Sequence, residues 1–151
     1  MKKAIIVFIQ FTFVFMLNAC KKENPPNIDI NAFLDCNAEL NLDTVASADR
    51  LVGKWELKYW YCGACYNPGY YNPDKKFVVT FNSANTYTIT ENYVVVDQGN
   101  WSINFIGTNK RQLVSTNKID HTSGILLFCD NKLLFSDGDN DGTDNLFEKA
   151  D

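Results

Sequence analysis

Four cysteines have the number and spacing of a disulfide framework. With Cys20 set aside, the five cysteines of the chain leave Cys36, Cys62, Cys65 and Cys129. An even number of cysteines in an exported chain indicates disulfide pairing. Four cysteines allow three pairings, of which we favour Cys62–Cys65 together with Cys36–Cys129.

Cys62 and Cys65 also form a C-x-x-C motif, which performs redox or metal chemistry in other proteins. A redox-active motif opens a helix, whose N-terminus lowers the pKa of the attacking thiol. Here the turn-like run Tyr66-Asn67-Pro68-Gly69 follows instead. Zinc would need further ligands, and the only histidine is His121. The motif therefore favours a structural disulfide, with metal or redox use as the alternative.

An acidic segment near the C-terminus matches a calcium-loop pattern. In the D-x-D-x-D-G-x5-E motif, oxygen atoms at alternate positions bind a hard cation. The corresponding residues are Asp137, Asp139, Asp141 and Glu148. The flank is wrong for an EF-hand, because Lys132–Ser136 predicts a strand. The alternative is an acidic hairpin turn between the last two strands. Calcium at these four residues is the only cofactor that the sequence suggests.

Tyrosines are concentrated in the segment Cys62–Lys75, which contains Tyr66, Tyr70 and Tyr71. Aromatic side chains with polar tips suit apolar ligands, sugars and protein partners. We therefore expect this Tyr-rich loop to bind a ligand or a partner. The alternative is that its rings only cover the mouth of the folded domain.

Asp120 and His121 resemble an acid–base pair only superficially. No serine or cysteine nucleophile lies in a recognisable setting with them. We therefore expect a solvated loop at this position and no enzyme activity.

The segments around these residues alternate apolar and polar side chains, as half-buried strands do. In Leu51–Tyr61 the residues Trp55, Leu57, Tyr59 and Tyr61 share one face, and Ser47–Gly53 predicts a short helical turn before it. Further strands are expected at Phe77–Phe81, Thr86–Thr90, Tyr93–Val96, Trp101–Phe105, Leu113–Ser115, Ile125–Cys129, Lys132–Ser136 and Leu146–Phe147. This pattern predicts an all-β fold, an antiparallel up-and-down β-barrel of about eight strands, because closure removes exposed strand edges. A sandwich is the alternative.

The N-terminus predicts export and attachment to lipid. Lys2 and Lys3 precede the apolar stretch Ala4–Leu17, which is too short for a transmembrane helix and is typical of a secretory signal. Leu17-Asn18-Ala19-Cys20 resembles the bacterial lipobox, with Cys20 as the lipidated residue; an ordinary cleaved signal is the alternative. We expect a lipoprotein signal peptide over 1–19, lipidated Cys20 and a flexible tether over 20–42, and a barrel domain over 43–151.

Composition limits the partners of the mature chain. The formal net charge is -4, which argues against nucleic acid, because a nucleic-acid-binding surface is basic. The polar segment Lys21–Asn31, with its Pro-Pro pair, suits a spacer between membrane and domain. By resemblance to other lipoproteins, Lys21 after the cysteine favours the outer membrane of the cell envelope.

Several short motifs recur in an order known from one group of proteins. They are Gly53-Lys54-Trp55, Phe81 with Thr86-Tyr87-Thr88, Gly99-Asn100-Trp101, and an Asp/Gly-rich turn before Leu146-Phe147-Glu148-Lys149. Together they resemble the small lipocalin-like lipoproteins of the Gram-negative envelope, over roughly Asp49 to Lys149. The resemblance implies a barrel closed at one end around a central apolar cavity, and it names no ligand.

Two functions follow from this interpretation. The first is a binding module for a small apolar ligand, because one face of each strand can line a cavity. The expected lining residues are Trp55, Leu57, Tyr59, Phe81, Tyr87 and Trp101. The second is a barrel filled by its own side chains that binds an unidentified protein partner through the Tyr-rich loop. The volume of the interior distinguishes them.

Overall fold

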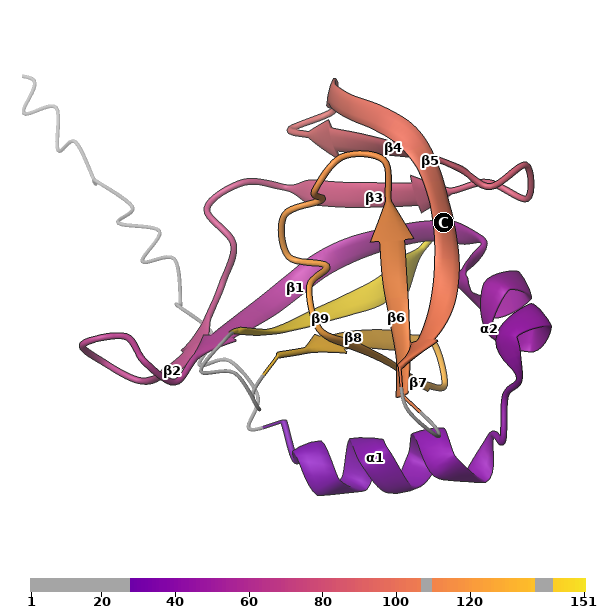
Figure 1. Cartoon of the computed structure of the whole chain (residues 1–151). Coiled ribbons are helices and arrows are strands. Elements are labelled where there is room, and N and C mark those ends of the chain that lie inside the picture. Colours follow the sequence, from indigo (N-terminus) through magenta and orange to yellow (C-terminus); the bar gives the residue numbers. More distant parts are fainter. Residues whose placement is uncertain (1–27, 107–109, 138–142) are drawn as a thin grey trace, which may run out of the picture.

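The computed structural model describes residues 28–106, 110–137 and 143–151. Within these residues nine strands form one sheet, and two helices precede it in the chain (Figure 1). The helices are α1 (Ile30–Glu39) and α2 (Thr44–Leu51). The strands are β1 (Gly53–Cys62), β2 (Gly69–Tyr71), β3 (Phe77–Phe81), β4 (Thr86–Glu91), β5 (Val94–Ile106), β6 (Lys110–Ser115), β7 (Ile125–Cys129), β8 (Lys132–Ser136) and β9 (Thr143–Ala150). Within these residues, neither helix has the length and apolar character needed to span a bilayer.

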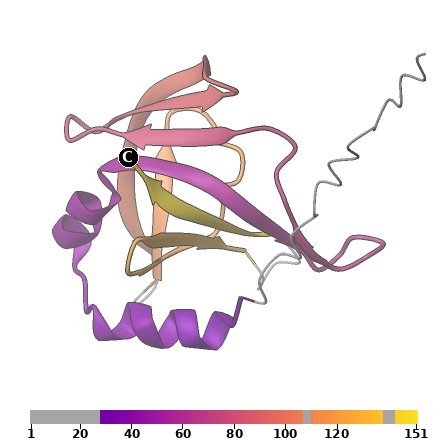
Figure 2. The same ribbon diagram turned by 180° about the vertical axis from the view of Figure 1, so that it is seen from behind.

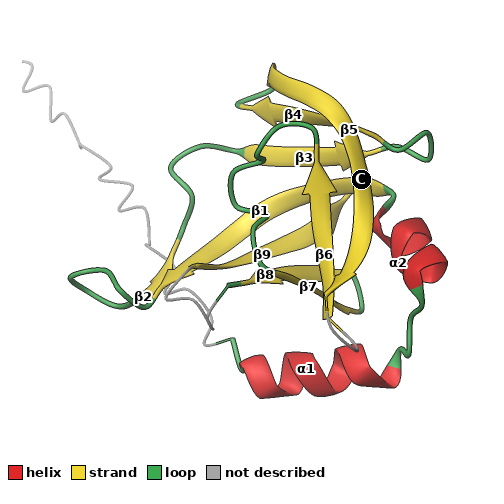
Figure 3. Cartoon of the chain, viewed as in Figure 1, coloured by secondary structure: helices red, strands yellow, loops and turns green. Residues whose placement is uncertain are grey.

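The strands form an antiparallel sheet that curls into a nearly closed barrel (Figure 3). Neighbouring strands follow the order β6-β5-β4-β3-β1-β9-β8-β7, and β2 pairs with the far half of β1. The two end strands, β6 and β7, are in contact. The expected all-β fold with an up-and-down barrel of about eight strands is confirmed.

Inward-facing side chains form the main core of the barrel. β3 and β4 bury alternate residues, as half-buried strands do. Every strand except β2 contributes to this core. Its buried members are Leu51, Trp55, Leu57, Phe77, Val79, Phe81, Tyr87, Ile89, Trp101, Ile103, Leu113, Ile119, Leu126, Phe128, Leu133, Phe135 and Phe147.

Helix α1 covers the outer face of β7, β8 and β9 (Figures 1 and 2). A second apolar cluster lies there, made of Phe33 from the helix and Leu127, Leu134 and Leu146 from the three strands. These strands are therefore buried on both faces, which explains why their apolar runs are continuous rather than alternating.

The segment over 20–42 was expected to be a tether, and the structure corrects this for α1. The Asp29 carboxylate caps the helix by accepting hydrogen bonds from the backbone N–H groups of Asn31 (2.9 Å) and Ala32 (3.3 Å). A disulfide joins Cys36 to Cys129 on β7. The helix is ordered by apolar strands that are distant in sequence, so a local pattern could not predict it.

Side chains close the seam between β6 and β7. The Asn37 side-chain oxygen accepts a hydrogen bond from the backbone N–H of Phe128 (2.9 Å) and another from Arg111 on β6 (2.9 Å). Arg111 also donates to the carbonyl of Leu42 (2.8 Å) and to the hydroxyl of Ser47 (3.2 Å). Burial lowers the pKa of the Arg111 guanidinium, because desolvation disfavours its charged form. α1, β6 and β7 are thus joined at one point.

Candidate functional site

The side chains expected to line a ligand cavity are packed against one another. Trp55 is 1% exposed and Trp101 is 4% exposed, and Leu57, Phe81 and Tyr87 lie within the same range. A hollow large enough for water would leave accessible area on these side chains. Their polar tips have partners, since the indole of Trp55 donates to the carbonyl of Leu51 at 2.7 Å. The five residues therefore fill the barrel.

Tyr59 does not share this interior, contrary to the expectation from its spacing. Leu57 pairs with Phe147 and Tyr59 pairs with Leu146, so Lys58 is an extra residue in β1. Such a β-bulge reverses which residues face inward. Tyr59 consequently points outward and lines a groove of about 270 Å³ beside α1.

The Tyr-rich loop forms an aromatic hairpin, which we define as Trp60–Tyr71. After the bulge Trp60 faces inward, and its ring stacks on that of Tyr71 with centroids 4.7 Å apart. Tyr61 and Tyr70 pair on the other face at 4.9 Å. Tyr66, at the loop between β1 and β2, is 99% exposed. The hairpin therefore has an ordered aromatic base and a fully exposed tyrosine near its tip.

Tyr70 connects this hairpin to the N-terminal end of the described chain. Its hydroxyl donates a hydrogen bond to the carbonyl of Ile28 at 3.0 Å. Burial, and secondarily the charge of Asp144, raises the pKa of Tyr70. The phenol is therefore protonated at neutral pH and can act as this donor.

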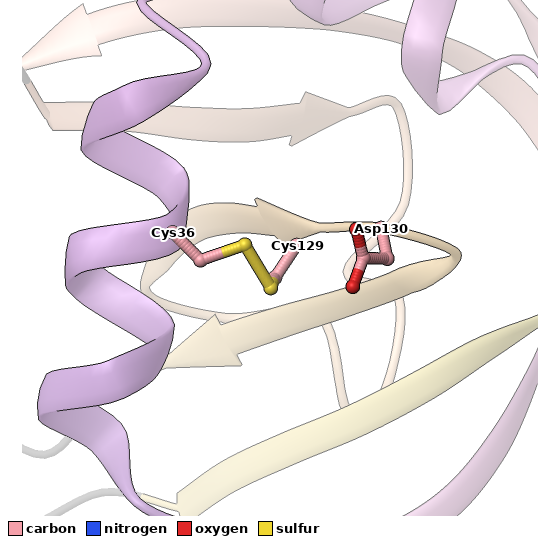
Figure 4. Close-up of side chains that lie close together, drawn as sticks. All are labelled: Cys36, Cys129 and Asp130. Atoms are coloured by element: carbon pink, nitrogen blue, oxygen red, sulfur yellow. A yellow bond between two sulfur atoms is a disulfide. The ribbon is translucent and has the colours of Figure 1, made fainter.

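The four cysteines form the two disulfides that were favoured, Cys36–Cys129 and Cys62–Cys65. Asp130 lies beside Cys36 and Cys129 (Figure 4), so the three resemble a metal-binding group. A metal requires thiolates, and here both sulfur atoms are bonded to each other. Among the described residues no other cluster of this kind occurs. With their sulfur atoms paired, Cys36 and Cys129 offer no thiolate to a metal.

The acidic segment is only partly described. Asp139 and Asp141 lie outside the described residues, whereas Asp137 follows β8 and Glu148 lies in β9. Glu148 pairs with Lys132, and Asp144 pairs with Ser136. Four residues of extended strand therefore separate Glu148 from the end of the turn, or about 13 Å. Glu148 does not act as the twelfth ligand of a compact loop, and calcium at the other three residues stays a prediction.

A pocket of about 260 Å³ with a mixed lining lies at the end of the barrel, and we call it the His121 pocket. Its lining combines apolar, aromatic and ionisable side chains from β1, β3, β4 and the connections between strands. They are Leu57, Trp60, Pro73, Asp74, Lys75, Phe77, Glu91 and His121. Lys75 and Glu91 form an ion pair at 2.8 Å.

His121 lies in the connection between β6 and β7, as expected, but it is half-buried rather than fully solvated. Its backbone is left-handed, with φ of 62°, a conformation that asparagine, aspartate and histidine adopt more often than other non-glycine residues. Its Nδ1 lies 3.0 Å from the side-chain oxygen of buried Asn145. Its ring contacts the edge of Phe77 at 5.3 Å. The sequence analysis considered His121 only beside Asp120, and no local pattern joined it to the other lining residues, because they come from distant segments.

The exposed stretch Tyr93–Val96 extends the β4–β5 hairpin. All four of its residues are apolar and more than half exposed. β6 pairs with β5 only from Trp101 onward, so among the described strands β4 alone pairs with this stretch. It is an apolar strand edge of the kind that associates with other chains.

No protein-family model, curated protein or solved structure matches the chain. The resemblance to lipocalin-like lipoproteins therefore stays a prediction from the motifs of the sequence. The leader and Cys20 lie outside the described residues.

Proposed function

We propose that the protein is a lipid-anchored envelope protein of lipocalin-like type that acts as an interaction module. Its barrel is filled, and it binds a protein partner through the aromatic hairpin. The main support is the contrast between the side chains in the barrel interior, which are at most a few per cent exposed, and Tyr66, which is 99% exposed. A filled interior leaves the surface as the place where binding occurs.

The aromatic hairpin has the physical properties of a binding surface. Tyrosine and tryptophan supply large contact area with little conformational freedom to lose, and they are enriched in interfaces. The Trp60–Tyr71 and Tyr61–Tyr70 pairs and the Cys62–Cys65 disulfide order the hairpin in advance. Preorganisation of this kind reduces the entropy lost on binding.

The position of the hairpin supports a partner close to the membrane. The Tyr70 hydroxyl donates a hydrogen bond to the carbonyl of Ile28, and Ile28 lies eight positions after the proposed anchor at Cys20. A chain of that length spans at most about 28 Å. The hairpin would therefore remain within this distance of the lipid surface.

The test is site-specific photo-crosslinking in the native envelope. A photoreactive amino acid at Tyr66 should form a discrete adduct with one membrane-associated protein. The matched control is Ser83, which is exposed in the β3–β4 turn at the far end of the molecule (Figures 1 and 2). Equal adducts from both positions, or adducts with lipid alone from Tyr66, would contradict the proposal.

Native mass spectrometry of the same protein tests the filled barrel separately. We expect the mass of the protein with its anchor and nothing more. A copurifying apolar molecule of a few hundred daltons, retained in the gas phase, would restore the first hypothesis of a ligand in the interior.

A further inference from the structure

The His121 pocket contains hydrogen-bond acceptors whose orientation is fixed by buried groups. Asn145 is completely buried, and its side-chain nitrogen donates to the carbonyl (3.3 Å) and hydroxyl (3.0 Å) of Thr143. The side-chain oxygen of Asn145 must therefore face His121. Since that oxygen only accepts, Nδ1 of His121 carries the hydrogen.

This arrangement determines the chemistry of the other ring nitrogen. In a neutral imidazole with a hydrogen on Nδ1, Nε2 is an acceptor. Nε2 of His121 makes no hydrogen bond to any residue of the described chain. A ligand that donates a hydrogen bond could therefore bind to Nε2 of His121.

The charges around the pocket disfavour anions, and the Asp74 carboxylate is available as a hydrogen-bond acceptor. Glu91 is neutralised by Lys75 at 2.8 Å. Asp74 is exposed, and no residue in the described ranges forms an ion pair with it. The pocket therefore has two carboxylates and one ammonium, and the excess negative charge repels anionic ligands.

The remaining lining is apolar and rigid. Leu57 and Phe77 are buried, and Trp60 is held by its stack on Tyr71. A ligand that fits must present an apolar surface to these side chains and hydrogen-bond donors to His121 and Asp74. A purely apolar molecule that covers Nε2 of His121 would displace water from it without replacing the hydrogen bond, which is unfavourable.

We propose that the His121 pocket binds the pyranose ring of a saccharide. A sugar ring is neutral, its hydroxyl groups donate hydrogen bonds, and its C–H face packs on aromatic and aliphatic side chains. The pocket volume of about 260 Å³ accommodates one such ring. In the complex, Nε2 of His121 and the Asp74 carboxylate accept from hydroxyl groups, and Trp60 contacts the C–H face.

The test is a binding titration of the full-length protein in a detergent without a sugar headgroup. The probes are glucose, galactose, mannose and N-acetylglucosamine, with methylammonium and inorganic phosphate for comparison. We expect saturable binding of at least one sugar and a chemical-shift change at the Trp60 indole N–H. His121→Asn and Asp74→Asn should each weaken binding about tenfold or more, because the first removes the Nε2 acceptor and the second replaces one acceptor oxygen of the carboxylate by an NH2 donor.

Control variants separate this site from its surroundings and from the aromatic hairpin. Asp120→Asn changes an exposed neighbour of His121 that does not line the pocket, so binding should be unchanged. Tyr66→Ser should also leave sugar binding intact, even if it abolishes the proposed protein contact. His121→Asn keeps a residue that tolerates the left-handed backbone, and Asp74 is exposed, so both variants should fold.

Three results would overturn the proposal. They are no saturable binding of any sugar, sugar binding that is insensitive to both His121→Asn and Asp74→Asn, and binding of methylammonium or phosphate alone. None of them bears on crosslinking from Tyr66, so the failure of one proposal is distinguishable from the failure of the other.

Discussion

At the scale of single residues, the interior depends on a close contact between Gly99 and Tyr87. The two residues pair across β4 and β5, and Tyr87 is 1% exposed. A Cβ at Gly99 would lie 2.9 Å from the Tyr87 ring. The glycine is required for space, because the ring is fixed by a hydrogen bond from its hydroxyl to Asp97 at 2.8 Å.

Gly99→Ala should therefore destabilise the protein by about 1–3 kcal/mol, because the ring must move within a packed core. The measurement is the free energy of unfolding in urea. Gly69→Ala is the matched control, since nothing lies within 4 Å of a Cβ there. Equal stability of the two variants would contradict the packed contact.

Asp97 also makes stability depend on pH. It accepts hydrogen bonds from Tyr87 (2.8 Å) and from Asn117 (2.9 Å). Chiefly the Tyr87 bond holds the pKa of Asp97 below its ordinary value of 3.8. A folded-state pKa below the unfolded value contributes stability at higher pH, and that contribution is lost as the pH falls through 3.8 and below.

We expect Asp97→Asn to lose stability less steeply than the unmodified protein as the pH is lowered from about 6 to about 3. Urea denaturation at several pH values measures this slope. Tyr87→Phe removes the main donor and should flatten the slope in the same direction. An unchanged slope in both variants would show that this carboxylate has no part in it.

At the scale of elements, α1 is joined to the barrel by packing and by a covalent bond. Phe33 packs on Leu127, Leu134 and Leu146, and the Cys36–Cys129 disulfide spans 93 positions of sequence. Closing a long loop removes more entropy from the unfolded chain than closing a short one. The two disulfides should thus differ in their effect on stability.

Replacing Cys36 and Cys129 by serine should reduce the free energy of unfolding by about 5 kcal/mol in the loop-entropy model. The same replacement of Cys62 and Cys65, separated by three positions, should reduce it by only about 2 kcal/mol. Thermal or urea denaturation under non-reducing conditions makes the comparison. A larger loss of stability on removing Cys62–Cys65 than on removing Cys36–Cys129 would contradict the loop-entropy explanation.

At the scale of the whole molecule, the barrel is completed by side chains as well as by strand pairing. β6 and β7 are neighbours in space, and Asn37 accepts hydrogen bonds from Arg111 on β6 and Phe128 on β7. Asn37 lies on α1, so the helix that covers the sheet also joins its two ends.

Asn37→Ala should lower the free energy of unfolding by about 1–3 kcal/mol, because two donors lose their acceptor in a partly buried setting. Hydrogen exchange at the Phe128 amide should accelerate at the same time. Asn31→Ala, at an exposed position on the same helix, is the control and should change neither quantity. Unaltered exchange at Phe128 in Asn37→Ala would show that the seam closes without this residue.

Local patterns in the sequence were sufficient for most of the strands, but β2 was not expected, and β5 is one strand where two were expected, at Tyr93–Val96 and Trp101–Phe105. Phe77–Phe81 and Thr86–Glu91 pair as neighbouring strands, and β7 and β8 have the expected bounds. The reason is that strand period and turn chemistry are properties of adjacent residues. The cysteine pairing was also anticipated.

The sequence by itself thus determined the fold class, most of the strands and the oxidised cysteines. Only the tertiary structure decided which side chains face the interior of the barrel and which segments pack against one another. The bulge at Lys58 turned Tyr59 outward, and α1 was ordered by apolar strands about a hundred residues away. His121, which the sequence assigned to solvent, is oriented by Asn145 and Phe77. Register, filling of the interior and side-chain orientation arise from contacts between distant segments, and no local period encodes those contacts.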